Sequence, residues 1–276
     1  MRVFVSCDME GVAGVVDWSQ CRGPATEYET ARHLLVAEVN AAVGGAFEAG
    51  ATDVLVNDSH GLMANLPPGE LDQRAAYLSG RHKPMYMMQG LDDSFGAVLF
   101  VGYHGSMGSG GVLSHTYNPR AVYGARLNGA VVGEAGINCL VAVAHRVPVA
   151  LVTGDDVTIA ETSALLPGVE GVVVKQAVSR FSAVNRSPEG ACEAIGQGAR
   201  QAVRRALRNE LSPPPIQAPY SLEVDWLTTD MAAMATWVGG IERTGERTVT
   251  ISGDDPQVVF QRFVATVFIT RSLVET

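Results

Sequence analysis

Short apolar runs alternate with amphipathic helical stretches along the first three quarters of the chain. The runs that predict buried strands are RVFVSCD, TDVLVNDSHG, AAYLSG, AVLFVGYHGS, VPVALVTGDD and GVVVKQAV. Helices are expected over residues 28–49, over GEAGINCLVAVAHR, and over residues 188–209 with Ser187 as the N-cap. This alternation indicates an α/β fold with a mostly parallel, doubly wound sheet and helices on both faces.

The pattern changes at LSPPPIQAP, residues 211–219, where the density of prolines predicts a linker. Beyond it come a strand (YSLEVDWL), a helix over residues 230–237, a strand (ERTVTISG) and a helix over residues 257–271. We therefore expect an α/β catalytic domain over residues 1–211 and a smaller α+β lobe over residues 212–276. Within the first part, the dipeptide Asn128-Gly129 predicts a hairpin in ARLNGAVVG.

Composition narrows the class of protein. The net charge of −9 and the pI near 5.1 argue against nucleic-acid binding, which needs a basic patch. No apolar run is long enough to predict a membrane span, and the N-terminal apolar stretch meets acids by position 8, too early for a signal peptide. The cysteines show no CxxC spacing, so we expect free thiols and a cytoplasmic protein; they are Cys7, Cys21, Cys139 and Cys192.

Polar residues collect where the predicted strands end. They are Asp8, Glu10, His60, His104 and Glu134, the last at the first turn of a predicted helix. The carboxyl ends of parallel strands meet at one edge of a sheet, so one fold could bring all five together. Mixed nitrogen and oxygen donors suit zinc, and five donors exceed the need of one tetrahedral ion. The set predicts two metal ions with a bridging carboxylate.

Each of these residues has a plainer interpretation when it is taken alone. Asp8 could cap a helix, and Glu134 could be an acid favoured by a helix dipole. His60 could end a turn in NDSHG, and His104 could be a core histidine with satisfied hydrogen bonds. The coincidence of five such residues at strand ends is what favours the metal site.

His115 follows the glycine-rich segment GSMGSGGVLS, which begins just after His104. The segment lacks the GK[ST] ending of a phosphate-binding loop, which argues against nucleotide binding. We expect a flexible loop whose glycines allow close approach of a substrate and carry His115 beside the metals. The alternative is a plain surface loop.

Several stretches, in this order, closely resemble the D-aminopeptidase family of the dipeptide-transport operons: SCDMEG, VLVNDSHG, GLDDSF, LFVGYHG, GVLSHT, VGEAGIN, VALVTGDD and VVVKQAVSR. The resemblance runs from residue 1 to about residue 190. The family motif Ser-x-Asp-x-Glu-Gly is matched by Ser6, Asp8, Glu10 and Gly11.

The resemblance implies a zinc-dependent peptidase that removes N-terminal D-residues from short peptides or aminoacyl amides. It implies two zinc ions per chain and a catalytic role for His115. The zinc ligands that it implies are Asp8, Glu10, His60, His104 and Glu134. It also implies a ring-like homo-oligomer, a decamer, and we expect the region after about residue 212 to take part in the subunit contacts.

Two other functions remain open from the residues themselves. The same ligands would serve a metal-dependent amidase or deacylase that acts on a non-peptide substrate, or a metal-stabilised protein that binds peptides without turnover. An aminopeptidase must also recognise a free amine. Asp155 and Asp156 are weak candidates for that role, and a loop or cap role is an equal expectation for them.

Overall fold

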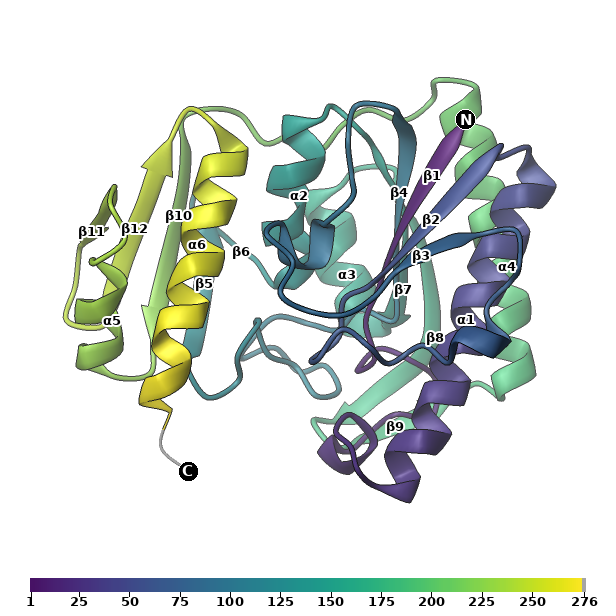
Figure 1. The fold of residues 1–276 in the computed structure, drawn as a ribbon, viewed down its shortest axis with the longest axis horizontal. Helices are drawn as coiled ribbons and strands as arrows, with labels where there is room; N and C mark the ends of the chain where they lie inside the picture. The colour runs from purple at the N-terminus through teal and green to yellow at the C-terminus, as the bar shows by residue number, and fades with distance from the viewer. Residues whose placement is uncertain (275–276) are drawn as a thin grey trace.

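A seven-stranded sheet forms the larger part of the molecule in the computed structural model, which describes residues 1–274 (Figure 1). The strand order is β3-β2-β1-β4-β7-β8-β9, parallel throughout except for the antiparallel pair β8–β9. The predicted α/β class is confirmed. The strands are β1 (Arg2–Cys7), β2 (Asp53–Asp58), β3 (Ala76–Leu78), β4 (Phe95–Val101), β7 (Val149–Asp155), β8 (Glu170–Ser179) and β9 (Ser182–Asn185).

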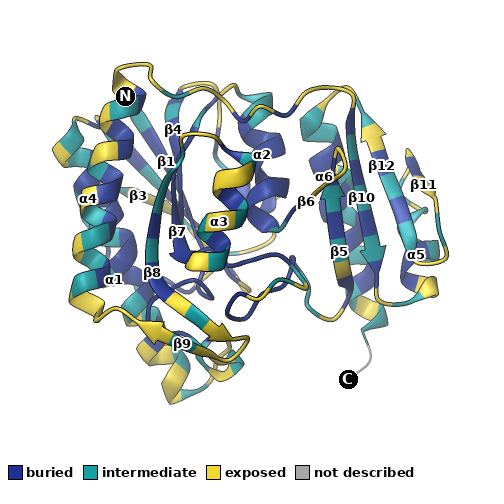
Figure 2. Cartoon of the chain, turned by 180° about the vertical axis from the view of Figure 1, so that it is seen from behind, coloured by how far each residue is buried: buried dark blue, intermediate teal, exposed yellow. Residues whose placement is uncertain are grey.

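Helices cover both faces of this sheet, as the pattern predicts. α1 (Thr26–Ala49) and α4 (Pro188–Leu207) pack together on one face, and α2 (Glu134–Ala144) and α3 (Asp156–Leu165) lie on the other (Figures 1 and 2). Val3 and Val5 of β1 join the core under α1, whereas Phe4 joins the core on the opposite face. Because both faces are buried, the strand reads as a continuous apolar run. The sequence pattern did not predict α3 or β9.

A second, antiparallel sheet has the order β11-β12-β10-β5-β6. The expected boundary at residue 211 does not coincide with the division between the sheets, because two of these strands precede it in the chain. The predicted Asn128-Gly129 turn joins them, with φ of 49° and 84°. The strands are β5 (Val122–Leu127), β6 (Ala130–Val131), β10 (Tyr220–Trp226), β11 (Ile241–Arg243) and β12 (Thr248–Gly253).

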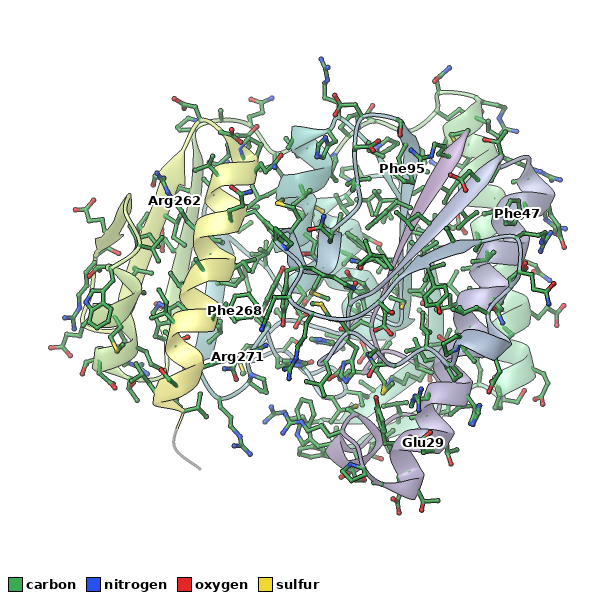
Figure 3. All side chains as sticks on the ribbon, in the orientation of Figure 1. Glu29, Phe47, Phe95, Arg262, Phe268 and Arg271 are labelled. Carbon is green, nitrogen blue, oxygen red and sulfur yellow. The ribbon has the colours of Figure 1, made fainter. Side chains whose placement is uncertain are left out.

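Two further helices accompany the second sheet, α5 (Thr229–Ala235) and α6 (Pro256–Thr270), and α6 also packs against α2. Near the end of α6, Phe268 packs edge-on against Tyr86, and Arg271 donates to the Tyr86 hydroxyl at 2.9 Å (Figure 3). The second sheet is thereby attached to the loops beside the carboxyl ends of the large sheet. The short 3-10 turns are η1 (Trp18–Gln20), η2 (Pro68–Glu70), η3 (Tyr86–Met88) and η4 (Arg271–Leu273).

None of the helices within residues 1–274 combines the length and apolarity that crossing a membrane requires. All four cysteines are free thiols, as the sequence predicts.

Glu38 is a buried acid inside the apolar core between α1 and the large sheet. Its Oε1 accepts a hydrogen bond from the Ala13 amide at 2.8 Å, while Oε2 has no partner among the described residues. Burial raises the pKa of Glu38 to about 7, against the lowering effect of the Ala13 hydrogen bond and of Lys175. The carboxyl is therefore largely protonated in the folded chain below neutral pH.

The pKa of Glu38 predicts a pH-dependent effect of Glu38→Gln on stability. Between its ordinary pKa of 4.5 and about 7, the folded chain holds a proton that the unfolded chain has lost, so this group makes the folded state less stable as pH rises. Glutamine stays neutral. We expect Glu38→Gln to match the parent near pH 4.5 and to gain up to about 3 kcal/mol near pH 8.

Denaturant unfolding at both pH values measures this difference. Glu48→Gln, on the exposed surface of the same helix, is the control and should show no such pH-dependent gain. A gain for Glu38→Gln that is equal at both pH values would contradict the assignment.

Candidate metal centre

Asp8 and Glu10 lie just beyond β1, where the chain runs very close to the loop after β4. The Asp8 amide donates to the Val101 carbonyl, and the Gly11 amide donates to the Gly102 carbonyl, both at 2.8 Å. A Cβ atom on Gly11 would lie only 1.8 Å from the Tyr103 carbonyl oxygen. Only glycine fits at this position. The close approach brings the first pair of carboxylates against the residues that follow β4.

Three histidines share one arrangement: one ring nitrogen bonds to a backbone carbonyl and the other faces a carboxylate. His60 Nε2 donates to the Cys21 carbonyl at 2.8 Å, and His60 Nδ1 lies 3.1 Å from Asp8 Oδ1 and 2.9 Å from Glu10 Oε2. His104 Nδ1 donates to the Gly105 carbonyl at 3.0 Å. His104 Nε2 is 3.3 Å from Asp8 Oδ2 and 3.3 Å from Glu134 Oε1.

His115 repeats this arrangement. Its Nδ1 donates to the Leu113 carbonyl at 2.9 Å, and its Nε2 lies 3.5 Å from Glu134 Oε1. Its ring stacks on that of His104, with centroids 4.1 Å apart and planes 8° apart. A backbone carbonyl thus selects the tautomer of each ring and leaves the other nitrogen directed at the carboxylates, as hydrogen bonds to the ligand histidines of metal sites do.

The structure brings together all five residues for which the sequence predicts metal binding. The prediction that all five lie at one edge of one sheet is wrong for Glu134. Asp8, Glu10, His60 and His104 follow β1, β2 and β4 of the large sheet. Glu134 does not come from that edge, because the short strand before it, β6, belongs to the second sheet. Glu134 is instead the first residue of α2, and its Oε1 accepts the Tyr117 amide at 2.7 Å.

The electrostatics of the cluster follow from buried opposite charges. Burial disfavours the carboxylate of Asp8, but hydrogen bonds and charge from His104 and His60 outweigh it and hold its pKa far below the usual range. Burial likewise lowers the pKa of both imidazoles, and the adjacent carboxylates outweigh it and raise them well above the ordinary value. The pKa of His115 is lowered, by burial and by its neighbour His104.

The donor set fits divalent metal ions. Glu10 Oε2 and His104 Nε2 are buried and lie 2.9 and 3.3 Å from groups of opposite charge, yet neither makes a well-aligned hydrogen bond with another described residue, so both atoms are suited to bind a metal ion. Ligand atoms of Asp8, Glu10 and His104 lie within 4.8 Å of one another, and so do those of His104, His115 and Glu134. These overlapping groups combine oxygen and imidazole nitrogen, the donors that zinc prefers when thiolates are absent.

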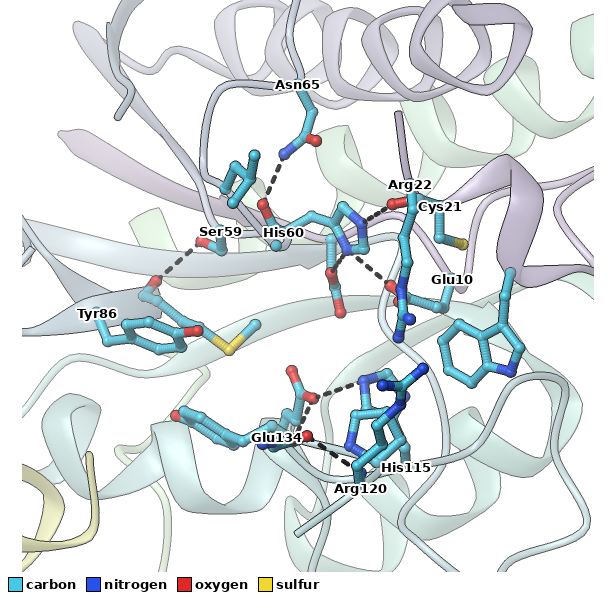
Figure 4. A pocket seen from close by; sticks show the side chains of 18 of the residues that line it. Glu10, Cys21, Arg22, Ser59, His60, Asn65, Tyr86, His115, Arg120 and Glu134 are labelled. Atoms are coloured by element: carbon cyan, nitrogen blue, oxygen red, sulfur yellow. Dashed lines mark hydrogen bonds and ion pairs between the residues drawn. The ribbon is translucent and has the colours of Figure 1, made fainter. Parts of the chain in front are cut away.

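A cavity of about 530 Å³ opens onto this cluster (Figure 4). Asp8, Glu10, His60, His115 and Glu134 line it, whereas the side chain of His104 is fully buried behind them. The other polar and aromatic residues of the wall include Trp18, Arg22, Tyr28, Tyr86, Tyr117, Asn118, Arg120 and Arg271.

The D-aminopeptidase family model matches residues 1–265 of this chain. The chain belongs to the D-aminopeptidase family. A D-aminopeptidase of Bacillus subtilis (strain 168) is 35% identical over 267 residues, which are 95% of this chain and 94% of the relative. The solved structure of the zinc-dependent D-aminopeptidase DppA from Bacillus subtilis, described as a self-compartmentalizing protease, matches with a TM-score of 0.90 at 34% identity. That match covers 98% of this chain and 97% of the other. The family resemblance is confirmed.

The glycine-rich segment of this D-aminopeptidase homologue is exposed in its middle, at Gly108 and Gly110, but its last residues are packed, unlike those of the expected flexible loop. Val112 and Leu113 are fully buried. The Val112 amide donates to Asp155 Oδ2 at 2.6 Å, and the Leu113 amide donates to the Arg180 carbonyl at 2.8 Å. These contacts hold the chain just before His115 in place.

Asp155 and Asp156 are not in the wall of the cavity. Asp155 is the N-cap of α3 and accepts the Thr158 amide at 2.7 Å, in addition to Val112. Asp156 is exposed and accepts the Ala177 amide at 2.8 Å. The sequence allowed a cap role for both residues, and the structure shows that role for Asp155.

The chain contains only two lysines, and both are buried beneath the loops that carry the predicted ligands. Lys175 Nζ donates to the carbonyls of Glu10, Val12 and Val15 at 2.6, 3.0 and 2.6 Å. Lys83 Nζ donates to Asn57 Oδ1 and to the Asp58 carbonyl, both at 2.6 Å, just before His60. Sequence reasoning missed both, although a lysine inside the apolar run VVVKQAV was a visible signal.

We expect Lys175→Met to weaken both the fold and metal binding. Methionine fills similar space but leaves three buried carbonyls without a donor, which should cost about 3 kcal/mol or more. The freed Glu10 loop should lower zinc affinity on the order of 10-fold or more. Denaturant unfolding and zinc titration measure the two effects. Gln176→Met, at the exposed next position of β8, is the matched control. Equal behaviour of the two variants would refute a positioning role for Lys175.

Proposed function

We propose that this protein is a zinc-dependent aminopeptidase that hydrolyses N-terminal D-amino acids from short peptides or amino-acid amides. The observation that carries the proposal is the shared geometry of the histidines, each held by a backbone carbonyl with its other nitrogen facing buried carboxylates. The D-aminopeptidase identity of the relatives supports the stereochemistry.

Asp8, Glu10, His60, His104 and Glu134 are the residues proposed to hold two zinc ions per chain. His104 lies between the two carboxylate groups, within 3.3 Å of both Asp8 and Glu134, which suits two neighbouring ions better than one. When bound, zinc supplies Lewis acidity that polarises a carbonyl and acidifies water. The buried residues of the chain fix where that chemistry takes place.

His115 is the proposed catalytic residue. It lines the cavity, whereas His104 does not, and the edge contact with Trp18, at 5.3 Å between centroids, holds its ring in place. Burial and the neighbouring His104 lower the pKa of His115, so the neutral imidazole is favoured. With Nδ1 bonded to Leu113, Nε2 is the atom that can accept a proton or attack a bound carbonyl.

The cavity suits a small substrate. A volume of about 530 Å³ lies within the range of small-ligand sites, and carboxylates at its base offer partners for a free amine. We place the enzyme in the cytoplasm, a reducing compartment in keeping with its four free thiols.

The first test is removal of metal. Chelation should abolish hydrolysis of D-alanyl amide, and added zinc should restore it, with about two zinc ions per chain in the active protein. His104→Ala should lose zinc and activity together. Full turnover by metal-free protein would reject the proposal, and a panel that also holds L-aminoacyl amides and N-acylated compounds would identify a deacylase if one is present.

His115→Ala should retain zinc and fold but lose turnover on the order of 10²-fold or more, as expected when a general base or nucleophile is removed. Zinc content and the rate constant for D-alanyl amide are the two readouts. A variant that loses its zinc would identify His115 as a ligand instead. A variant with zinc and a near-normal rate would show that the ring is only a wall residue.

The assembly is proposed to be a ring-like homo-oligomer, a decamer, with the region after about residue 212 in the subunit contacts. The description of DppA as self-compartmentalizing supports an assembly, and exposed Trp237 and Leu227 offer apolar surface in that region. Light scattering should give a mass several times that of the chain, and Trp237→Lys should reduce it. A stable monomer at micromolar concentration would contradict this proposal.

A further inference from the structure

Two arginines of the cavity wall have no partner of opposite charge. Arg22 and Arg120 both line the cavity, and Figure 4 shows their guanidinium groups pointing toward one another from opposite sides, between Glu10 and Glu134. Within residues 1–274 neither takes part in an ion pair. Two guanidinium groups without a partner at one cavity are suited to bind an anion between them.

Both arginines are attached directly to the segments that build the metal centre. Arg22 follows Cys21, whose carbonyl accepts the hydrogen bond from His60. The Arg120 amide donates to Asn118 Oδ1 at 3.1 Å and closes a turn. Asn118 directly follows Tyr117, whose amide donates to Glu134. The backbone of both residues is therefore held beside the cluster, and their side chains are exposed.

Trp18 sets how far Arg22 lies from the reacting region. The Arg22 guanidinium lies 5.2 Å from the centroid of the Trp18 ring, and that ring packs 5.3 Å from the centroid of His115. The guanidinium is thus two ring contacts from His115. An extended peptide spans about 3.5 Å per residue, so no more than about three residues fit between a carbonyl at His115 and Arg22.

The proposed reaction decides which end of a peptide lies where. An aminopeptidase cleaves the first peptide bond, so the N-terminal residue lies at the metal centre and the C-terminal carboxylate lies further along the cavity wall. Guanidinium groups bind carboxylates with strong, often bidentate hydrogen bonds. Arg271, the third arginine of the wall, donates to the Tyr86 hydroxyl. The guanidinium groups of Arg22 and Arg120 donate no hydrogen bond to another described residue, and we take them as the pair that binds the anion.

We infer that Arg22 and Arg120 bind the C-terminal carboxylate of a short peptide whose N-terminal residue lies at the metal centre. This inference rests on the proposed peptidase function and narrows its substrate class to free-acid peptides of about two to four residues. Amino-acid amides and C-terminally amidated peptides lack the anion and bind less tightly.

Binding of two non-hydrolysable probes tests the inference without turnover. The probes are D-alanyl-D-alanine with its peptide bond reduced to CH₂–NH, as the free acid and as the C-terminal carboxamide. Calorimetry on zinc-loaded wild type should show the acid binding on the order of 10-fold tighter or more. In Arg22→Gln/Arg120→Gln the ratio should fall to about 1. The control Arg204→Gln removes one positive charge from an exposed position of α4 and should keep the wild-type ratio.

Zinc content and turnover of D-alanyl-D-alanine, measured on the same proteins, separate the outcomes. A ratio near 1 in wild type, no binding of either probe, or an unchanged ratio in the double variant overturns the inference. Loss of zinc from the double variant also overturns it, because the arginines would then support the metal centre. Turnover with a ratio near 1 rejects the inference and leaves the peptidase function. A preserved acid preference without turnover rejects the peptidase function and leaves the arginine site.

Discussion

Three carboxylates at the base of the cavity, those of Asp8, Glu10 and Glu134, are only 3–4% exposed, and the rest of the site depends on compensating their charge. Removing a carboxylate from water costs on the order of several kcal/mol even after relaxation, so the fold must supply positive charge nearby. The imidazoles of His60 and His104, which lie within 3.3 Å of these carboxylates, do so. Protons and divalent cations compete for the same nitrogen and oxygen atoms, so the cluster holds whichever of the two binds more strongly.

The scaffold around the cluster consists of neutral backbone groups more than of further charges. Backbone carbonyls fix the histidine tautomers, and Lys175 and Lys83 hold the carbonyls of the two loops that carry Glu10 and His60. Burial lowers the pKa of both lysines to about 8. Their hydrogen bonds offset part of that burial cost, which allows both lysines to lie in the interior.

The sequence identifies the residues of the site better than it identifies their supports. Strand-end positions follow from the period of the apolar runs, so Asp8, His60 and His104 could be placed at one edge of a parallel sheet. The origin of Glu134 could not, because the pairing of β5 with β10 joins residues about a hundred positions apart, and local pattern carries no information on it. Loop packing was missed for the same reason. Glycines suggest a flexible backbone, but the hydrogen bond from the Val112 amide to Asp155 depends on tertiary structure.

The second sheet is small, but it contributes residues to the cavity and to the cluster. It delivers Glu134 to the cluster through β6, and it delivers Arg271 to the cavity wall through α6. The cavity therefore lies where two sheets meet, and neither sheet alone encloses it. A shift of α6 against α2 would move Arg271 and Tyr86 together, since a hydrogen bond joins them, and Tyr86 stacks on Tyr117, whose amide holds Glu134. Packing between the sheets thus reaches the acid at the base of the cavity through three direct contacts.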